Sequence, residues 1–123
     1  MLELTDVSVR FGHRLVLDRV SLAVPAGARL GIIGPAAGGK SVLLKVMAGL
    51  VPPTTGRLAL AGIDVTGWSE ERLAPVRARI GMLFQNYALF DFLSVGDNVG
   101  FPLVQRGVAD GERAARVDER LRA

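Results

Sequence analysis

The sequence contains no cysteine and a single histidine, His13. The absence of cysteine excludes disulfides and thiolate metal sites, and it is typical of proteins from a reducing compartment. One histidine leaves no cluster for zinc or for a Ser-His-Asp triad. No apolar run approaches the roughly 20 residues that cross a bilayer, and the N-terminus lacks the pattern of a secretory signal. We therefore expect a cytoplasmic protein, or one that a partner holds at a membrane.

Lysine is also scarce. The 123 residues include 2 lysines and 13 arginines. The net charge is +3, and the charged residues are scattered along the chain rather than gathered in one segment. Nucleic-acid surfaces concentrate their basic residues, so we expect no nucleic acid among the partners. The length corresponds to about one domain, and a hydrophobic content of 50% is typical of a globular protein.

Short apolar or alternating segments predict the strands. Alternation predicts strands over 4–11 and 15–24, and a strand pair is expected around Gly62. The short apolar run 29–33 is typical of a strand buried on both faces. The similar run 80–84 predicts a further strand.

Apolar residues recur at helical spacing over 39–50, which predicts a helix buried on most sides. A serine can cap a second helix over 69–79, and the segment 94–97 has the Ser-x-x-Asp spacing of a capping box before a third. Asp110 can cap a final helix, which reaches residue 123 with no glycine or proline stop signal. That ending favours a chain cut inside an element.

The most specific motif follows the predicted strand 29–33 and precedes the predicted helix. It reads Gly34-Pro35-Ala36-Ala37-Gly38-Gly39-Lys40-Ser41 and matches G-x-x-x-x-G-K-[ST]. Backbone N–H groups must wrap a triphosphate at close range, and glycines keep that surface bare. The free N–H groups and the dipole of the following helix attract the same anion.

Two side chains of this loop supply the remaining chemistry. The Lys40 ammonium can reach the β- and γ-phosphates, and the Ser41 hydroxyl can complete the oxygen shell of Mg²⁺. The alternative interpretation is a glycine-rich turn from strand to helix that carries a surface lysine. A lysine in this arginine-rich chain favours the phosphate role, since an ammonium is a compact point charge.

The order of motifs resembles the N-terminal half of the ATP-binding subunit of an ABC transporter, over residues 2 to about 105. The resemblance implies an α/β fold, a P-loop NTPase core with an antiparallel β subdomain, truncated in the helical subdomain. Residues 1–123 would then be the N-terminal part of one ATP-binding domain. The antiparallel portion is expected at 1–30 and 57–65, the phosphate-binding loop and helix at 31–50, and the Q-loop and start of the helical subdomain at 80–123.

The resemblance also assigns residues to ATP and Mg²⁺. Phe11 takes the place of an aromatic that stacks on adenine, for which the alternative is a strand-end core residue. Gln85 takes the place of the glutamine that meets Mg²⁺ and the attacking water, for which the alternative is an exposed strand-end residue. Lys40 and Gln85 are thus the expected catalytic residues, and Ser41 and Gln85 the expected metal ligands. The expected nucleotide-binding residues are Phe11, Gly34, Pro35, Ala36, Ala37, Gly38, Gly39, Lys40, Ser41 and Val42.

Three residues depart from the family pattern. The family usually has Ser or Asn at the place of Ala36, Gly at that of Ala37, and Thr at that of Val42. Ala37 matters most, because a Cβ restricts the loop if its φ angle is positive. Val42 removes a hydroxyl near the phosphates, so both changes bear on nucleotide affinity.

Segments 41–45 and 82–99 resemble one branch in particular, the ATPases of lipid-asymmetry transporters that work with MCE-type substrate-binding proteins. The resemblance implies a transmembrane permease and a second ATP-binding subunit in a head-to-tail dimer as partners, at the inner face of the cell membrane. Apolar residues after Gln85 can line a groove for a permease helix or form ordinary core; they are Tyr87, Leu89, Phe90, Phe92 and Phe101.

The chain has no signature motif, no strand ending in Asp-Glu and no switch histidine, all of which the family needs for turnover. We therefore expect an N-terminal fragment of an ATPase that hydrolyses ATP as the full-length protein and is inactive as residues 1–123 alone. One alternative is a soluble ATPase of the same type that acts on nucleic acid or ribosomes. Another is a non-catalytic nucleotide-binding module.

Overall fold

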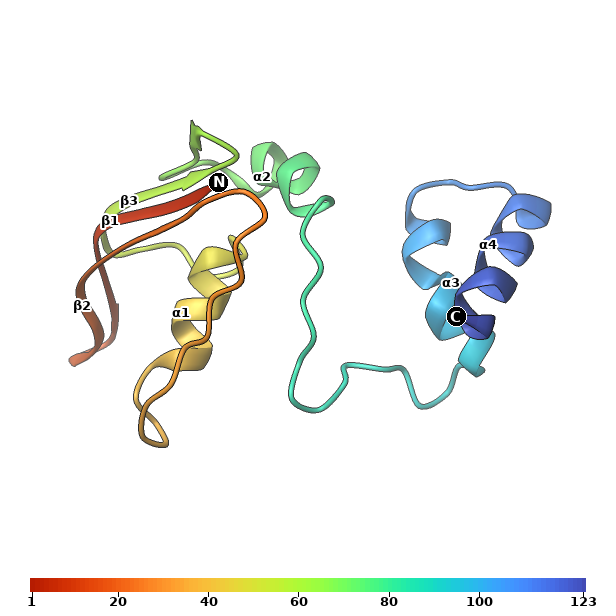
Figure 1. The fold of residues 1–123 in the computed structure, drawn as a ribbon, viewed down its shortest axis with the longest axis horizontal. Helices are drawn as coiled ribbons and strands as arrows, with labels where there is room; N and C mark the ends of the chain where they lie inside the picture. The colour runs from red at the N-terminus through yellow and green to blue at the C-terminus, as the bar shows by residue number, and fades with distance from the viewer. The chain divides into compact units, whose positions relative to one another are not determined.

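The computed structural model describes all 123 residues, and the chain divides into two compact units, Met1–Met82 and Leu83–Ala123. In the first unit a sheet is joined to two short helices, and the second unit is a pair of helices with the segment that precedes them (Figure 1). Each unit has its own packing.

The sheet of the first unit has four antiparallel strands in the order β2-β1-β3-β4. Their bounds are Leu2–Phe11 for β1, Arg14–Val24 for β2, Thr55–Leu60 for β3 and Ile63–Asp64 for β4. Two-residue turns at 12–13 and 61–62 join the two hairpins. The predicted strands over 4–11 and 15–24 and the strand pair around Gly62 are confirmed.

Three register shifts bend the long hairpin of β1 and β2. The pairing shifts between Leu4 and Val7, between Val7 and Val9, and again directly after Val9. The first shift lets Leu4 and Val7, which are three residues apart, join Val9 in the core. The bulged residues Asp6 and Arg19 have φ angles of 48° and 45°. Each bulged N–H is satisfied by a serine on the opposite strand, at 2.9 Å from the hydroxyl oxygen.

Gly56 of β3 lies directly against the Asp6 bulge. Its φ is 91°, and a Cβ at this position would lie 2.4 Å from the Asp6 carbonyl oxygen. Real Cβ atoms do not approach backbone so closely, so the pairing of β1 with β3 requires glycine here.

We predict that Gly56→Ala destabilises the protein by at least about 2 kcal/mol, because a left-handed alanine and a backbone clash add together. The matched control is Gly62→Ala, whose φ of 81° carries similar strain but whose added Cβ meets nothing within 4 Å. The control should lose only about 1 kcal/mol. Urea unfolding followed by circular dichroism measures both, and equal losses would contradict the steric argument.

Helices α1 (Lys40–Met47) and α2 (Glu70–Arg77) complete the first unit. Leu43 and Val46 of α1 are buried in the same cluster as the sheet residues, and Leu73 brings α2 to it. The full set of buried core residues is Leu4, Val7, Val9, Leu17, Leu43, Val46, Leu58, Leu60, Val65 and Leu73. Both predicted helices are thus present, although α1 is shorter than the predicted 39–50. Ser69 occupies the N-cap position of α2 as predicted, but its side chain makes no capping hydrogen bond.

The predicted strands over 29–33 and 80–84 are wrong for the structure, in which both segments lack regular pairing. Ile33 is 96% exposed and Leu83 is 83% exposed, so neither segment is buried. A strand exists only where a neighbour satisfies its N–H and C=O groups, and within residues 1–123 nothing pairs with these runs. An apolar run predicts a tendency to be buried, whereas pairing depends on a second segment.

The second unit contains α3 (Val95–Gln105) and α4 (Asp110–Arg122), joined by a short loop. The Ser94 side chain accepts a hydrogen bond from the Asp97 N–H at 3.1 Å, which confirms Ser94 as the cap of α3. Asp110 is the first residue of α4 rather than its cap, because Ala109 occupies the cap position. A Cβ on Gly100 would lie 3.3 Å from Val117, so the helices pack closely there. None of the four helices is long and apolar enough to cross a bilayer.

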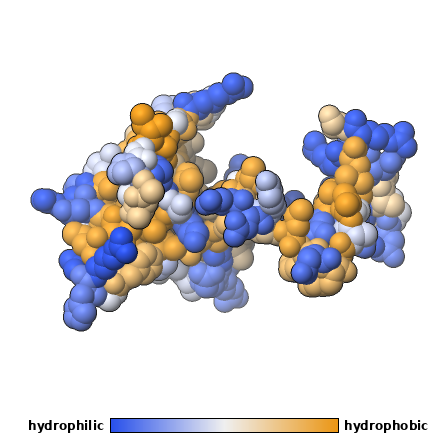
Figure 2. Space-filling model, turned by 90° about the horizontal axis from the view of Figure 1, so that it is seen from below, coloured by the Kyte–Doolittle hydropathy of each residue, from blue (hydrophilic) through white to orange (hydrophobic).

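Asn98 organises the segment before α3. Its amide nitrogen donates to the carbonyls of Phe90, Leu93 and Ser94, and its amide oxygen accepts from the Phe90 N–H at 2.8 Å. The Phe90 ring then lies 4.7 Å from that of Phe101. Other apolar side chains of this segment stay on the surface, where Tyr87, Leu89 and Phe92 are each about 70% exposed or more. Figure 2 shows apolar atoms at the surface of both units.

Candidate nucleotide-binding site

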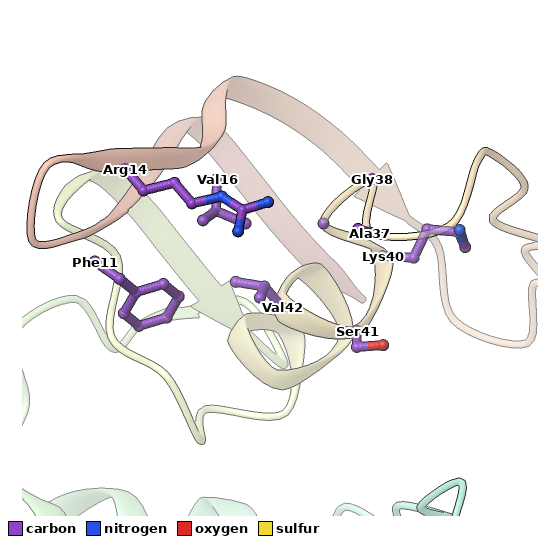
Figure 3. A pocket seen from close by; sticks show the side chains of 9 residues that line it. Phe11, Arg14, Val16, Ala37, Gly38, Lys40, Ser41 and Val42 are labelled. Carbon is purple, nitrogen blue, oxygen red and sulfur yellow. The ribbon is translucent and has the colours of Figure 1, made fainter.

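The loop before α1 and the hairpin of β1 and β2 form a pocket of about 420 Å³ in the first unit (Figure 3). Its lining residues are Phe11, Arg14, Val16, Ala37, Gly38, Gly39, Lys40, Ser41 and Val42. The lining contains two cationic side chains and no acidic one. The pocket is therefore suited to an anion.

Gly39 lies where the loop touches the sheet. Its φ is 81°, and a Cβ there would lie 3.0 Å from the carbonyl oxygen of Val16 and 3.0 Å from Leu17. The backbone of β2 thus lies against the loop at the residue before α1. Only a glycine permits both the left-handed turn and the close approach.

Ala37 and Gly38 form the tip of the loop. Ala37 has a φ of 58°, so the condition under which its Cβ restricts the loop is met. The Gly38 N–H donates to the Pro35 carbonyl at 3.2 Å, and a Cβ on Gly38 would lie 3.0 Å from that oxygen. By contrast, a Cβ on Gly34 would meet nothing within 4 Å.

Helix α1 directs its N-terminus at the pocket, because its first residues Lys40, Ser41 and Val42 all line it. Gly39 caps the helix without a side chain, and the first N–H groups of a helix have no partner within it. The first turn also holds no acidic residue that would compete with a bound anion. Free donors and the helix dipole together favour a phosphate at this end.

The Lys40 ammonium folds back over its own loop. It donates to the carbonyl oxygens of Gly34 at 2.8 Å and Pro35 at 2.5 Å. An ammonium has three N–H donors, so one remains for a further acceptor. The Ser41 hydroxyl makes no hydrogen bond in the structure and is exposed, which leaves its oxygen available to a cation.

The structure brings most of the predicted nucleotide-binding residues together. Phe11, 52% exposed at the end of β1, lies at one end of the pocket, and residues 37–42 form the other. Gly34, Pro35 and Ala36 belong to the loop but do not line the pocket. Gln85 is exposed and belongs to the second unit, so its predicted part in catalysis and metal binding remains a prediction. The roles of the other predicted residues are also predictions.

Arg14 and Val16 line the pocket but were not predicted from the sequence. The signal was present in the turn at 12–13, since a two-residue connection pairs Phe11 directly with Arg14. Val16 gave no such signal, because the pairing shifts between Leu15 and Leu17 of this strand and leaves Val16 without a partner.

Comparison with known families decides the assignment of the chain. Residues 17–123 match the ABC transporter family. The chain belongs to this family. The phosphate-binding loop, Ser41 and Val42 all lie inside the matched region, whereas Phe11 precedes it.

Similar ABC proteins include two methionine import ATP-binding proteins, both named MetN. The protein from Rhizobium johnstonii is 44% identical over 98% of this chain and 33% of its own length, and that from Corynebacterium diphtheriae is 46% identical over 85% and 31%. The Fe(3+) ions import ATP-binding protein FbpC of Escherichia coli is 40% identical over 97% of this chain and 33% of its own. The chain thus spans about a third of the length of these relatives.

Solved ABC structures show the same fold. The dimeric structure of MJ0796, a bacterial ABC transporter cassette, superposes with a TM-score of 0.89 and 28% identity over 99% of this chain and 56% of that one. A post-hydrolysis state of MJ0796 bound to ADP and Pi matches with the same TM-score. The predicted fold class, an ABC ATPase core with an antiparallel β portion, is confirmed.

We predict that Ala37→Val weakens ATP binding about tenfold or more, because a β-branched residue at a φ of 58° is a steric outlier and the loop must change shape. The matched control is Ala36→Val. Ala36 is the neighbouring alanine, lies outside the pocket lining and has no positive φ. Titration calorimetry with ATP and Mg²⁺ measures both variants. Equal affinities for the two would contradict the role given to the Ala37 backbone.

Proposed function

We propose that the intact protein is the ATP-binding subunit of an ABC transporter, which it powers by ATP hydrolysis. The pocket supports this proposal most directly, because an aromatic side chain at one end and a helix N-terminus at the other match the two ends of a nucleotide. Phe11 would stack on the adenine, and the amides of residues 38–42 would hold the phosphates. The 123 residues would be the first part of one ATP-binding domain.

Lys40 and Ser41 would act on the outer phosphates. The third donor of the Lys40 ammonium, and the two that bond loop carbonyls, can turn to the β- and γ-phosphate oxygens. Mg²⁺ prefers oxygen ligands and keeps several waters, so the Ser41 hydroxyl fits its needs beside the phosphates. Gln85 is proposed as a further metal ligand and catalytic residue from the family resemblance alone. The metal would neutralise charge on the phosphates when bound. No cluster of three or more acidic or histidine side chains offers it a separate cage.

Hydrolysis would require groups beyond this pocket. Phosphoryl transfer depends on positioning and on charge stabilisation around the γ-phosphate, and the loop surrounds one side only. We propose that a second ATP-binding subunit closes the other side in a head-to-tail dimer, which the dimeric form of MJ0796 supports. The protein would then sit at the inner face of the cell membrane on a transmembrane permease. The exposed apolar segment around Tyr87 is the surface proposed for that contact.

The transported solute is proposed from the relatives. They are named for import of methionine and of Fe(3+) ions, and none of those reported above is named for lipid transport. We therefore propose import of a small solute, with methionine as the first candidate. The lipid cargo and the MCE-type partner expected from segments 41–45 and 82–99 have no support among these relatives.

We predict that Lys40→Ala abolishes ATP hydrolysis by the intact protein and removes the rise in its thermal midpoint on adding ATP and Mg²⁺. The protein has one other lysine, Lys45, which is exposed on the same helix five residues later and provides the control. Lys45→Ala should keep both the activity and the shift.

The same assay separates the rival functions. A thermal shift without hydrolysis in the assembled transporter would favour a non-catalytic nucleotide-binding module. Hydrolysis stimulated by ribosomes or nucleic acid, and not by the permease, would favour a soluble ATPase. No shift with the unaltered protein would overturn nucleotide binding itself.

The cargo is tested with the intact protein and its permease in liposomes. We expect ATP-dependent uptake of labelled methionine, and none with the Lys40→Ala variant. Transfer of labelled phospholipid without methionine uptake would instead restore the lipid interpretation.

A further inference from the structure

We propose that Arg14 is a nucleotide-binding residue that contacts the α-phosphate and ribose of ATP. The inference rests on the proposed function, since it adds a residue to the same pocket. Arg14 lies outside the phosphate-binding motif and is not the aromatic residue proposed to stack on adenine.

The position of Arg14 follows from the hairpin register. Phe11 is the last residue of β1 and Arg14 is the first residue of β2. The two are paired directly across the turn. Val16 is two residues farther along β2 and lines the same pocket. The carbonyl oxygen of Val16 lies 3.0 Å from an ideal Cβ on Gly39, which fixes this wall against the phosphate-binding loop.

These contacts place Arg14 between the two ends of the pocket. Two residues of strand span at most about 7 Å, so the Arg14 backbone lies within that distance of Val16. The extended arginine side chain covers a similar length. In Figure 3 it runs from the hairpin end in the direction of the loop, along the wall that Val16 shares. A nucleotide with its base on Phe11 and its outer phosphates on residues 38–41 must lay its ribose and α-phosphate against this wall.

The guanidinium of Arg14 is available for such a contact. It makes no hydrogen bond or ion pair in the structure, and no acidic residue lines the pocket. The nearby Arg10 differs, because its guanidinium donates to the His13 carbonyl in the turn at 3.2 Å. Lys40 also differs, because it bonds the carbonyls at the far side of the loop. Arg14 is thus the cationic side chain that is available to a ligand in the middle of the pocket. The N–H donors of its planar guanidinium suit phosphate oxygens.

The test compares AMP, ADP and ATP, which share only the α-phosphate among their phosphates. In the intact protein, Arg14→Gln should raise the Kd of all three by a similar factor of about five or more. Lys40→Ala should weaken ADP and ATP and spare AMP. Arg14→Lys keeps the charge and should recover part of the loss. NMR titration covers the weak AMP complex.

Two controls exclude a structural effect. Arg19→Gln alters an exposed arginine on the same strand that lies outside the pocket, and it should leave all three Kd values unchanged. The loss of nucleotide affinity caused by Arg14→Gln should be smaller at high salt, since the substitution removes a charge interaction rather than a packing contact. The thermal midpoint without nucleotide should stay at that of the unaltered protein.

Two results would overturn the inference alone. One is an unchanged Kd for ATP in Arg14→Gln, and the other is a loss for ATP with none for AMP. Failure of the unaltered protein to bind ATP would overturn the proposed function, and this inference with it.

Discussion

The contact between the β2 backbone and Gly39 is the constraint on which the site depends. A Cβ at Gly39 would lie 3.0 Å from both the Val16 carbonyl oxygen and the Leu17 side chain, and the Gly39 φ of 81° turns the chain into α1. Leu17 is also buried in the same core cluster as Leu43 of α1. The same strand residues therefore position the helix from one side and the loop from the other. The pocket forms where these two requirements meet.

Charge in the loop is balanced locally by Lys40. A carbonyl oxygen carries a partial negative charge, and two of them, on Gly34 and Pro35, accept hydrogen bonds from the ammonium. Those oxygens would otherwise repel an anion brought to the same loop. The ammonium therefore offsets the loop's own carbonyls and still has a donor for the ligand. An arginine would hold these oxygens less compactly, which is a physical reason for one of only two lysines to stand here.

Local patterns predicted those parts of the fold that local contacts stabilise. The hairpins and helices were predicted because each makes its hydrogen bonds within a short segment, and the Ser94 cap does the same. The runs 29–33 and 80–84 failed because apolar character says nothing about which segment will pair with them. The bulges at Asp6 and Arg19 were also unpredicted, since they depend on register between strands and on serines far along the chain.

The residues of the site also fall into those that a local motif predicts and those that depend on contacts between distant segments. The residues of the phosphate-binding loop could be predicted from the spacing of its motif. The sequence also predicted that the Ala37 Cβ restricts the loop if the φ angle is positive, and that angle is 58°. Arg14 required a non-local fact, namely that its strand partner is Phe11. A charged residue at the start of a strand is usually exposed to solvent. Only the strand pairing shows that Arg14 lies near Phe11 and the N-terminus of α1. Where a pocket is built from a hairpin and a loop, the residues that join its two ends are therefore found from strand register rather than from motifs.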